Sequence, residues 1–154
     1  GQVLDASAGF VAPAGSVIQV VSSNSNSYAR VQTTSTGYIA SGCGVSITPS
    51  STSSKILLLF TVGMSYSQIA SNAVILAIAR NTTVLNAGAA NYGGSFFQIP
   101  SNNNYIGSHQ SWVDSPSTTS SVAYNLYGRS QNGSLVFLLH EGSSYSLTAM
   151  EIAG

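Results

Sequence analysis

The sequence predicts an all-β protein, built as a sandwich or a barrel. About ten short segments of strand composition follow one another at spacings of roughly ten residues, with turn signals between them and no convincing helix. The longest apolar run, Ser54 to Ser67, alternates with a period of two. Only 5% of the residues are charged. The polar remainder is Ser, Thr, Asn and Gly, whose hydroxyls and amides satisfy strand and turn backbones without ion pairs.

The run from Ser54 to Ser67 is the predicted central strand. One of its faces is apolar without a break and is expected to be buried along its whole length; it carries Ile56, Leu58, Phe60, Val62, Met64 and Tyr66. The opposite face is apolar only in its first half, at Leu57 and Leu59. We therefore expect a second sheet or another subunit to cover that face in part.

The segments before this strand are short. Residues 1–15 mix small residues with no period and are expected to form an N-terminal lead-in or linker, with a single β-sandwich domain over residues 16–154. The predicted strands of this part are Ser16 to Ser22, Tyr28 to Gln32, Gly37 to Ala40 and Cys43 to Thr48. A bend at Gly42 is expected to separate the last two, and a turn over residues 49–54 to lead into the central strand.

The segment after the central strand is ambiguous. Asn72 to Arg80 fits a helix almost as well as a strand. A hairpin-like Asn81-Thr82 favours the strand, paired with Thr83 to Asn86. Ala87 to Tyr105 is rich in Gly and Asn around a short apolar island, Ser95 to Ile99, and is predicted to hold the variable loops.

The last part of the chain predicts a hairpin and a subunit interface. Its predicted strands are Ile106 to Val113, Ser121 to Ser130, Leu135 to His140 and Ser143 to Ile152. The second and third of these are expected to pair as a hairpin around Gln131-Asn132-Gly133. Both faces of this hairpin are apolar, and a sandwich of this size has one interior. We therefore expect a partner subunit to cover the surplus apolar face.

Composition and charge exclude several classes of function. The formal net charge is zero without a basic stripe, so we expect no nucleic-acid partner. No apolar run reaches the roughly 18 residues of a membrane helix, so we expect no membrane insertion. The four carboxylates are isolated, and neither a nucleophile elbow nor a phosphate loop occurs, so we expect no enzyme, no cofactor and no metal site. Cys43 is the only cysteine and is expected to be a small buried hydrophobe.

The candidate binding residues are Tyr92, Tyr105, His109 and Trp112. Aromatic rings beside Asn, Ser and Asp supply the stacking face and the hydrogen-bond edges that sugar binding needs. The alternative for Trp112, the only tryptophan, is a place inside the sandwich or across a subunit interface. For His109 and His140 a further alternative is a histidine cluster on a trimer axis, although a surface or hydrogen-bonded histidine is much more common. Arg30, Arg80 and Arg129 are interpreted as solvated or interface residues.

Six stretches carry a resemblance in their order along the chain: GSVIQVV, TTSTGY, VSITPSSTSSKILLLFTVG, ILAIARN, DSPSTTSSVAYNLYGRS and SLTAMEIAG. They resemble a family of bacteriophage virion domains that occur at the C-terminal ends of tail-fibre-like proteins, especially in marine and cyanobacterial phages. The resemblance covers Gly15 to Gly154, and its most specific segments are ITPSSTSSKIL and DSPSTTSS. The section from Ala87 to His109 departs from it.

The resemblance implies a β-sandwich of jelly-roll character, similar in outline to trimeric tumour-necrosis-factor or complement-C1q heads, and a homotrimer. The implied function is that of a virion structural protein on the exposed surface of a phage particle, among other virion proteins. It would be the terminal trimeric domain of a tail fibre or spike that binds a host-surface receptor, either a glycan or a protein. The alternative is a capsid decoration or cement protein that stabilises the shell and binds no receptor. In the first case the receptor contact is expected in Ala87 to His109, leading into Trp112.

Overall fold

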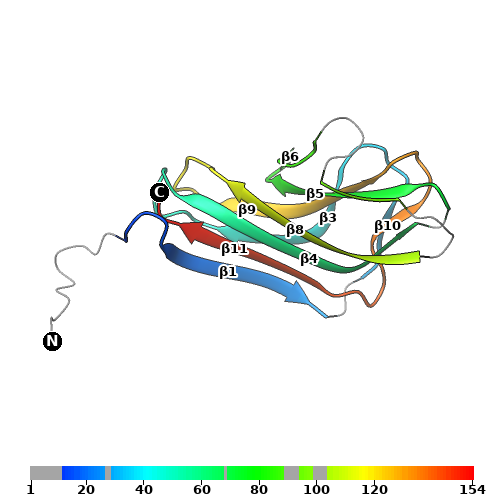
Figure 1. The fold of residues 1–154 in the computed structure, drawn as a ribbon, viewed down its shortest axis with the longest axis horizontal. Coiled ribbons are helices and arrows are strands. Elements are labelled where there is room, and N and C mark those ends of the chain that lie inside the picture. Colours follow the sequence, from blue (N-terminus) through cyan, green and yellow to red (C-terminus); the bar gives the residue numbers. More distant parts are fainter. Residues whose placement is uncertain (1–11, 27–28, 68, 89–93, 99–103) are drawn as a thin grey trace.

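The structure is a computed structural model that describes residues 12–26, 29–67, 69–88, 94–98 and 104–154. The predicted all-β fold is confirmed. The described residues form eleven strands and no helix, and the strands make two antiparallel sheets that face each other as a sandwich (Figure 1). Apolar side chains from both sheets fill the space between them.

The first sheet, sheet A, has six strands. In order across the sheet they are β1 (Val17–Ser25), β11 (Tyr145–Ile152), β4 (Lys55–Ser67), β10 (Val136–Leu139) and β2 (Val31–Thr33). The sixth strand, β8 (Asn104–Asp114), pairs with the other side of β4. The prediction that β4 is central is therefore confirmed, because its first half pairs with β11 on one side and β8 on the other.

The second sheet, sheet B, has five strands. Its order is β3 (Ile39–Ile47), β9 (Val122–Ser130), β5 (Ala73–Arg80) and β6 (Thr83–Val84), and β7 (Ser95–Gln98) also pairs with β5. The ambiguous segment is thus a strand, as favoured. It turns at Asn81-Thr82 and pairs with β6 through Arg80↔Thr83, with Asn81 in the left-handed region at φ 53°.

The predicted unbroken apolar face of β4 is wrong. Between Val62 and Ser65 the register with β8 shifts by one residue, which is a β-bulge. One extra residue reverses the alternation of side chains, so Ser65 and Ser67 are buried and Met64 is only half-buried. Tyr66 consequently lies on the outer face of sheet A, the face turned away from sheet B, where it stacks on the exposed Tyr105.

The predicted hairpin between Ser121 and His140 is also wrong. β9 belongs to sheet B and β10 to sheet A, so the chain crosses between the sheets at this turn. The crossing is stabilised by a residue that is distant in the sequence. The buried Asn72 donates from Nδ2 to Ser130 Oγ at 3.3 Å and to the carbonyl of Ser134 at 3.3 Å. A local Asn-Gly turn signal cannot distinguish a hairpin from such a crossing. Because all of β10 is buried within one chain, this segment gives no argument for a partner subunit.

Two smaller differences concern the first half of the chain. β3 is one strand with a register shift between Ala40 and Gly44, where two strands separated by Gly42 were predicted. Gly42 does have a positive φ, 81°, at that irregularity. β2 begins later than predicted, at Val31, and Tyr28 lies outside the described residues.

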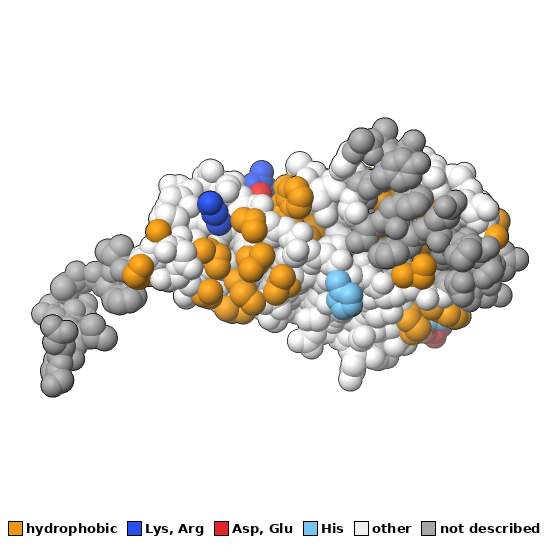
Figure 2. Space-filling model, viewed as in Figure 1, with side chains coloured by type: hydrophobic (Ala, Val, Ile, Leu, Met, Phe, Trp, Pro, Cys, Tyr) orange, Lys and Arg blue, Asp and Glu red, His pale blue; other side chains and the backbone are white. Residues whose placement is uncertain are grey.

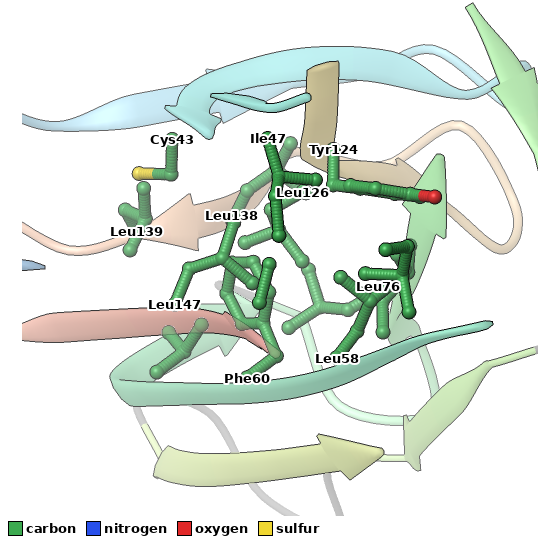
Figure 3. Packing of buried hydrophobic residues seen from close by; sticks show 14 of the residues in the cluster. Cys43, Ile47, Leu58, Phe60, Leu76, Tyr124, Leu126, Leu138, Leu139 and Leu147 are labelled. Carbon is green, nitrogen blue, oxygen red and sulfur yellow. The ribbon is translucent and has the colours of Figure 1, made fainter. Parts of the chain in front are cut away.

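The core lies between the two sheets (Figure 3). Leu58 and Phe60 of β4 and Leu147 of β11 meet side chains of sheet B that include Leu76 and Leu126. Cys43 is fully buried in the same cluster, as predicted. β5 is buried on both faces along its first seven residues, which explains why its apolar pattern also fits a buried helix.

The core leaves no room for a methyl group at Gly128. A Cβ there would press on the side chain of Leu138 and lie 3.0 Å from Cδ2 of Leu76. We expect Gly128→Ala to lower the free energy of unfolding by about 1–3 kcal/mol, measured by urea denaturation. Gly37→Ala is the matched control, because the nearest atom to its Cβ would be Ser35 Oγ at 3.5 Å, an ordinary contact. Equal stability of the two variants would contradict this packing.

Candidate recognition surfaces on sheet A

The sequence candidates do not form one site. Tyr92 lies outside the described residues. Tyr105, His109 and Trp112 are all on β8, where Tyr105 pairs with Tyr66 near the end of β4 and Trp112 with Leu58 near its beginning. At about 3.3 Å per residue, roughly 23 Å of strand separates Tyr105 from Trp112. Each of the three therefore has to be judged by its own surroundings.

Tyr105 belongs to a cluster of rings on the outer face of sheet A. The aromatic cluster consists of Tyr66, Tyr105, Phe137 and His140. Tyr66 is the middle ring: its centroid lies 5.2 Å from that of Tyr105 and 4.7 Å from that of Phe137, both in stacked geometry. The ring of His140 stands edge-on to Tyr105 at 5.0 Å and to Tyr66 at 5.8 Å.

Strand register explains this cluster. Tyr66 pairs directly with Tyr105 of β8 on one side and with Phe137 of β10 on the other. Directly opposed residues of antiparallel strands point to the same face, so three rings form one row across three strands. The bulge at residues 63–64 is what turns Tyr66 outward to complete the row.

The aromatic cluster has one solvent-exposed ring, which packs against buried rings. Tyr105 is 52% exposed, whereas Tyr66 and Phe137 are buried. The guanidinium of Arg30, an exposed residue, lies 5.6 Å from the centroid of the Phe137 ring. His140 donates from Nδ1 to the carbonyl of Glu141 at 3.0 Å, since a carbonyl oxygen can only accept. Nε2 is the second polar atom of the ring, and the hydrogen bond at Nδ1 does not use it.

Sequence reasoning identified Tyr105 but missed its neighbours. Tyr66 was placed in the core, Phe137 in a hairpin, and Arg30 among the solvated or interface residues. One signal was available: Gly63 inside an otherwise apolar strand is typical of a bulge, and a bulge exchanges the two faces of the strand.

His109 and Trp112 have different surroundings. His109 is exposed on the outer face of sheet A, and its Nδ1 lies 3.1 Å from Thr61 Oγ1. Trp112, 38% exposed, pairs with the core residue Leu58 and so stands on the side of β8 that faces sheet B, at the edge of the sandwich. Beside it Gln110 accepts from Asn86 at 3.0 Å and donates to the carbonyl of Leu76 at 3.1 Å, which ties this edge to sheet B.

A second exposed surface crosses sheet A at the end where β1 begins and β11 ends. Four apolar side chains pair in one line across four strands, Val20↔Met150↔Leu57↔Val113, and we call them the apolar row. Val20 is 53% and Val113 55% exposed, and the neighbouring Leu59 is also exposed. Figure 2 shows hydrophobic side chains gathered on this face. Leu57 and Leu59 lie on the outer face of sheet A, which the second sheet does not cover; coverage by another subunit stays a prediction.

Near the apolar row, a buried carboxylate ties the last strand to the turn before β4. Glu151 is fully buried. Its Oε1 accepts from Ser50 N at 2.7 Å, Ser50 Oγ at 2.6 Å and Ser54 Oγ at 2.6 Å, and its Oε2 accepts from Gln19 at 2.6 Å. Burial opposes the charge and would raise the pKa of Glu151, but these hydrogen bonds outweigh burial and lower the pKa to about 2. Glu151 is therefore an ionised structural group at neutral pH.

Asp114 makes a similar structural contact. It accepts from the hydroxyl of Tyr124 at 2.7 Å and pairs with Arg80 at 3.1 Å, which joins β8 to sheet B. Burial, followed by the hydrogen bond to Asp114 and the charge of Asp114, raises the pKa of Tyr124 above its ordinary value. Arg80 is thus ion-paired within the chain rather than solvated or in an interface.

In the described part of the chain, no three His, Cys, Asp or Glu side chains are grouped as metal ligands would be. The same residues include no helix long and apolar enough to cross a membrane. Comparison with known protein families and with curated proteins gives no match to this chain.

Proposed function

We propose that this chain is a virion structural module, the terminal trimeric domain of a phage tail fibre or spike. In this proposal the domain binds a receptor on the host surface, and the favoured class of receptor is a glycan. One observation carries the proposal. Sheet A presents two separate exposed surfaces at opposite ends of β4, the apolar row around Leu57 and the aromatic cluster around Tyr66. The first is suited to self-association and the second to a ligand. The virion setting itself rests on the sequence resemblance.

The pairing order of the strands supports a jelly roll. A jelly roll is a long antiparallel hairpin of eight strands wound up on itself, so its first strand pairs with its last, its second with its seventh, and so on inward. Leaving aside the short β2, β6 and β10, the chain pairs β1 with β11, β3 with β9, β4 with β8 and β5 with β7. The two sheets then have the orders β1-β11-β4-β8 and β3-β9-β5-β7.

The apolar row supports a homotrimer. Exposed apolar side chains scattered singly are ordinary on a protein surface, but a continuous line across four strands is typical of an interface. The chain has few charges, so a protomer that buries this face against copies of itself desolvates few ionised groups. Association through this face leaves the aromatic cluster uncovered at the other end of β4.

The position of the aromatic cluster supports receptor binding. β1 begins beside the start of β4, whereas Tyr105 and Phe137 flank the last residues of β4 (Figure 1). A ligand at the cluster is thus remote from the point where the chain enters the sandwich. An open ring beside an imidazole, with a guanidinium elsewhere on the same cluster, matches the stacking and polar contacts of sugar recognition. A decoration protein has no need of such a surface.

Tyr105→Ala tests the receptor proposal. We expect labelled wild-type protein to adsorb to at least one strain in a panel of marine bacteria and cyanobacteria. The variant should lose adsorption by tenfold or more, since truncation of an aromatic residue at the centre of a binding site costs about 2 kcal/mol or more. The melting temperature should change little, because the ring is half-exposed. Trp112→Ala is the matched control, an exposed aromatic side chain on the same strand outside the cluster.

Three results would contradict the proposal. Wild-type protein that adsorbs to no strain and to no bacterial polysaccharide would favour a decoration protein. Equal loss in Trp112→Ala would place the contact toward the end of β8, outside the aromatic cluster. Unfolding of Tyr105→Ala would make this ring a structural residue.

A further inference from the structure

We propose that the aromatic cluster recognises an acidic sugar, and that Arg30 anchors its carboxylate. This inference rests on the proposed receptor function and narrows it to one chemical class of glycan. It also revises the interpretation of Arg30 as a merely solvated or interface residue.

The guanidinium of Arg30 is held in place by a ring rather than by an acid. Its distance of 5.6 Å from the centroid of Phe137 is that of a cation–π contact. Within the described residues the only ion pair is that of Arg80 with Asp114, so no described carboxylate neutralises Arg30. A contact with the face of a ring does not satisfy the N–H donors of a guanidinium. Two of these N–H donors can bind the two oxygens of a carboxylate at the same time.

The remaining members of the aromatic cluster supply what a sugar ring needs beside its acid group. Phe137 contacts Tyr66 and Tyr66 contacts Tyr105, so the guanidinium and the open ring are linked through two buried rings. Tyr105 offers a face for the C–H groups of a pyranose, and His140, whose ring stands edge-on to Tyr105, offers Nε2 for a hydrogen bond with a hydroxyl. A cation and a stacking face at two points of one cluster are suited to an acidic oligosaccharide, in which one sugar stacks on Tyr105 and the carboxylate of a neighbouring sugar binds Arg30.

Because the chain carries so few charges, any binding of an acidic glycan depends on local contacts such as those of Arg30. The chain has four Lys and Arg residues and four Asp and Glu residues, with a net charge of zero. General attraction of the protein to polyanions is therefore weak. Binding of an acidic glycan would have to come from local contacts, of which Arg30 is the one positive group at the aromatic cluster. Glu141 is exposed on the turn that begins directly after His140 of the aromatic cluster. Its negative charge would weaken the binding of an acidic glycan.

Matched polysaccharides test the inference. A polyuronate such as alginate, the same polymer with its carboxylates reduced to alcohols, and a sulfated galactan are each immobilised and titrated with wild-type protein. The bacterial polysaccharides of the adsorbing strain are tested with and without the same reduction. We expect binding to the carboxylated form and a loss of roughly tenfold or more on reduction, since hydrogen bonds between a guanidinium and a carboxylate are strong.

Variants assign the effect to Arg30. Arg30→Gln should lose tenfold or more in affinity for the carboxylated polymer, Arg30→Lys should lose less, and Glu141→Gln should bind slightly more tightly. Lys55→Gln removes the same charge from an exposed residue at the beginning of β4, whereas the aromatic cluster lies near the end of this strand. This variant should bind the carboxylated polymer with wild-type affinity.

The outcomes distinguish a failure of the acidic-sugar inference from a failure of the proposed receptor function. If wild-type protein binds native and reduced polymers equally, or if Arg30→Gln binds like wild type, the acidic-sugar inference is wrong and the receptor function stands. Binding to the sulfated polymer alone would also overturn the carboxylate assignment. If wild-type protein binds no glycan and no cell, both proposals fall.

Discussion

Glu151→Gln should destabilise the protein by about 2–4 kcal/mol at pH 7, because breaking a buried hydrogen-bonded charge network leaves its partners unsatisfied. Four donors converge on the carboxylate, and they come from β1 and from the turn before β4. An amide at this position would direct its NH₂ at Nε2 of Gln19, which is itself a donor. Gln19 cannot turn over freely, since the same Nε2 donates to the carbonyl of Thr48 at 2.7 Å.

The loss should depend on pH. The pKa of Glu151 is lowered to about 2 in the folded protein, and an unfolded glutamate titrates near 4.3. The resulting stabilisation, roughly 3 kcal/mol, is fully present above the unfolded pKa and is lost as the pH falls toward the folded pKa. Urea denaturation should therefore show a large difference between wild type and Glu151→Gln at pH 7 and a much smaller one at pH 2.5. Above about pH 5 this group adds no pH dependence.

Glu141→Gln is the control for this experiment, since it makes the same chemical change at an exposed turn residue. It should leave the unfolding free energy within about 0.5 kcal/mol of wild type. All proteins are compared at one protomer concentration, because association contributes to apparent stability. A Glu151→Gln penalty that is equal at pH 7 and pH 2.5 would contradict the ionised, hydrogen-bonded state of Glu151.

These carboxylates also explain the two most specific segments of the sequence. The serines of ITPSSTSSKIL include Ser50 and Ser54, whose hydroxyls bind Glu151. The first residue of DSPSTTSS is Asp114, which binds Arg80 and the hydroxyl of Tyr124. Both segments therefore contain residues that stabilise the fold. In a chain with so few charges, an isolated carboxylate proved to be structural at both positions.

The fold was predictable to the level of strands because alternation and turn residues act locally. β4, β5 and the Asn81-Thr82 hairpin follow from spacing and composition alone. The layer to which each strand belongs was less predictable. Placement of β9 and β10 in different sheets depends on Asn72, some 60 residues earlier in the chain than the turn that it holds. No local pattern contains that information.

The candidate recognition surface was predictable only in part, for a related reason. Tyr105 was identified from its polar neighbours in sequence, and the structure leaves it half-exposed. The rings beneath it come from β4 and β10, and only strand register brings them together. A single bulge in β4 decides whether Tyr66 faces the core or the outer surface. Period-two reasoning without that bulge assigns it to the wrong face.

The largest effect is expected on assembly. We expect wild-type protein at micromolar concentration in reducing buffer to sediment at three times its chain mass of 15.8 kDa, and Val20→Glu/Val113→Glu to sediment as a monomer. Both side chains are more than half exposed in the protomer, so the substitutions should barely affect its folding. In a trimer built on the apolar row they would place like charges, unpaired and desolvated, in one interface, at a cost of several kcal/mol per protomer.

Ile69→Glu is the matched control for assembly. Ile69 is 51% exposed, as much as Val20, but lies in the turn between β4 and β5, away from the apolar row. It should remain a trimer, which would show that position rather than added charge breaks the assembly. The buried, single Cys43 offers no disulfide, so reducing buffer should change nothing. Sedimentation equilibrium of the wild type as a monomer, or of the double variant as a trimer, would show that copies of the chain do not meet through the apolar row.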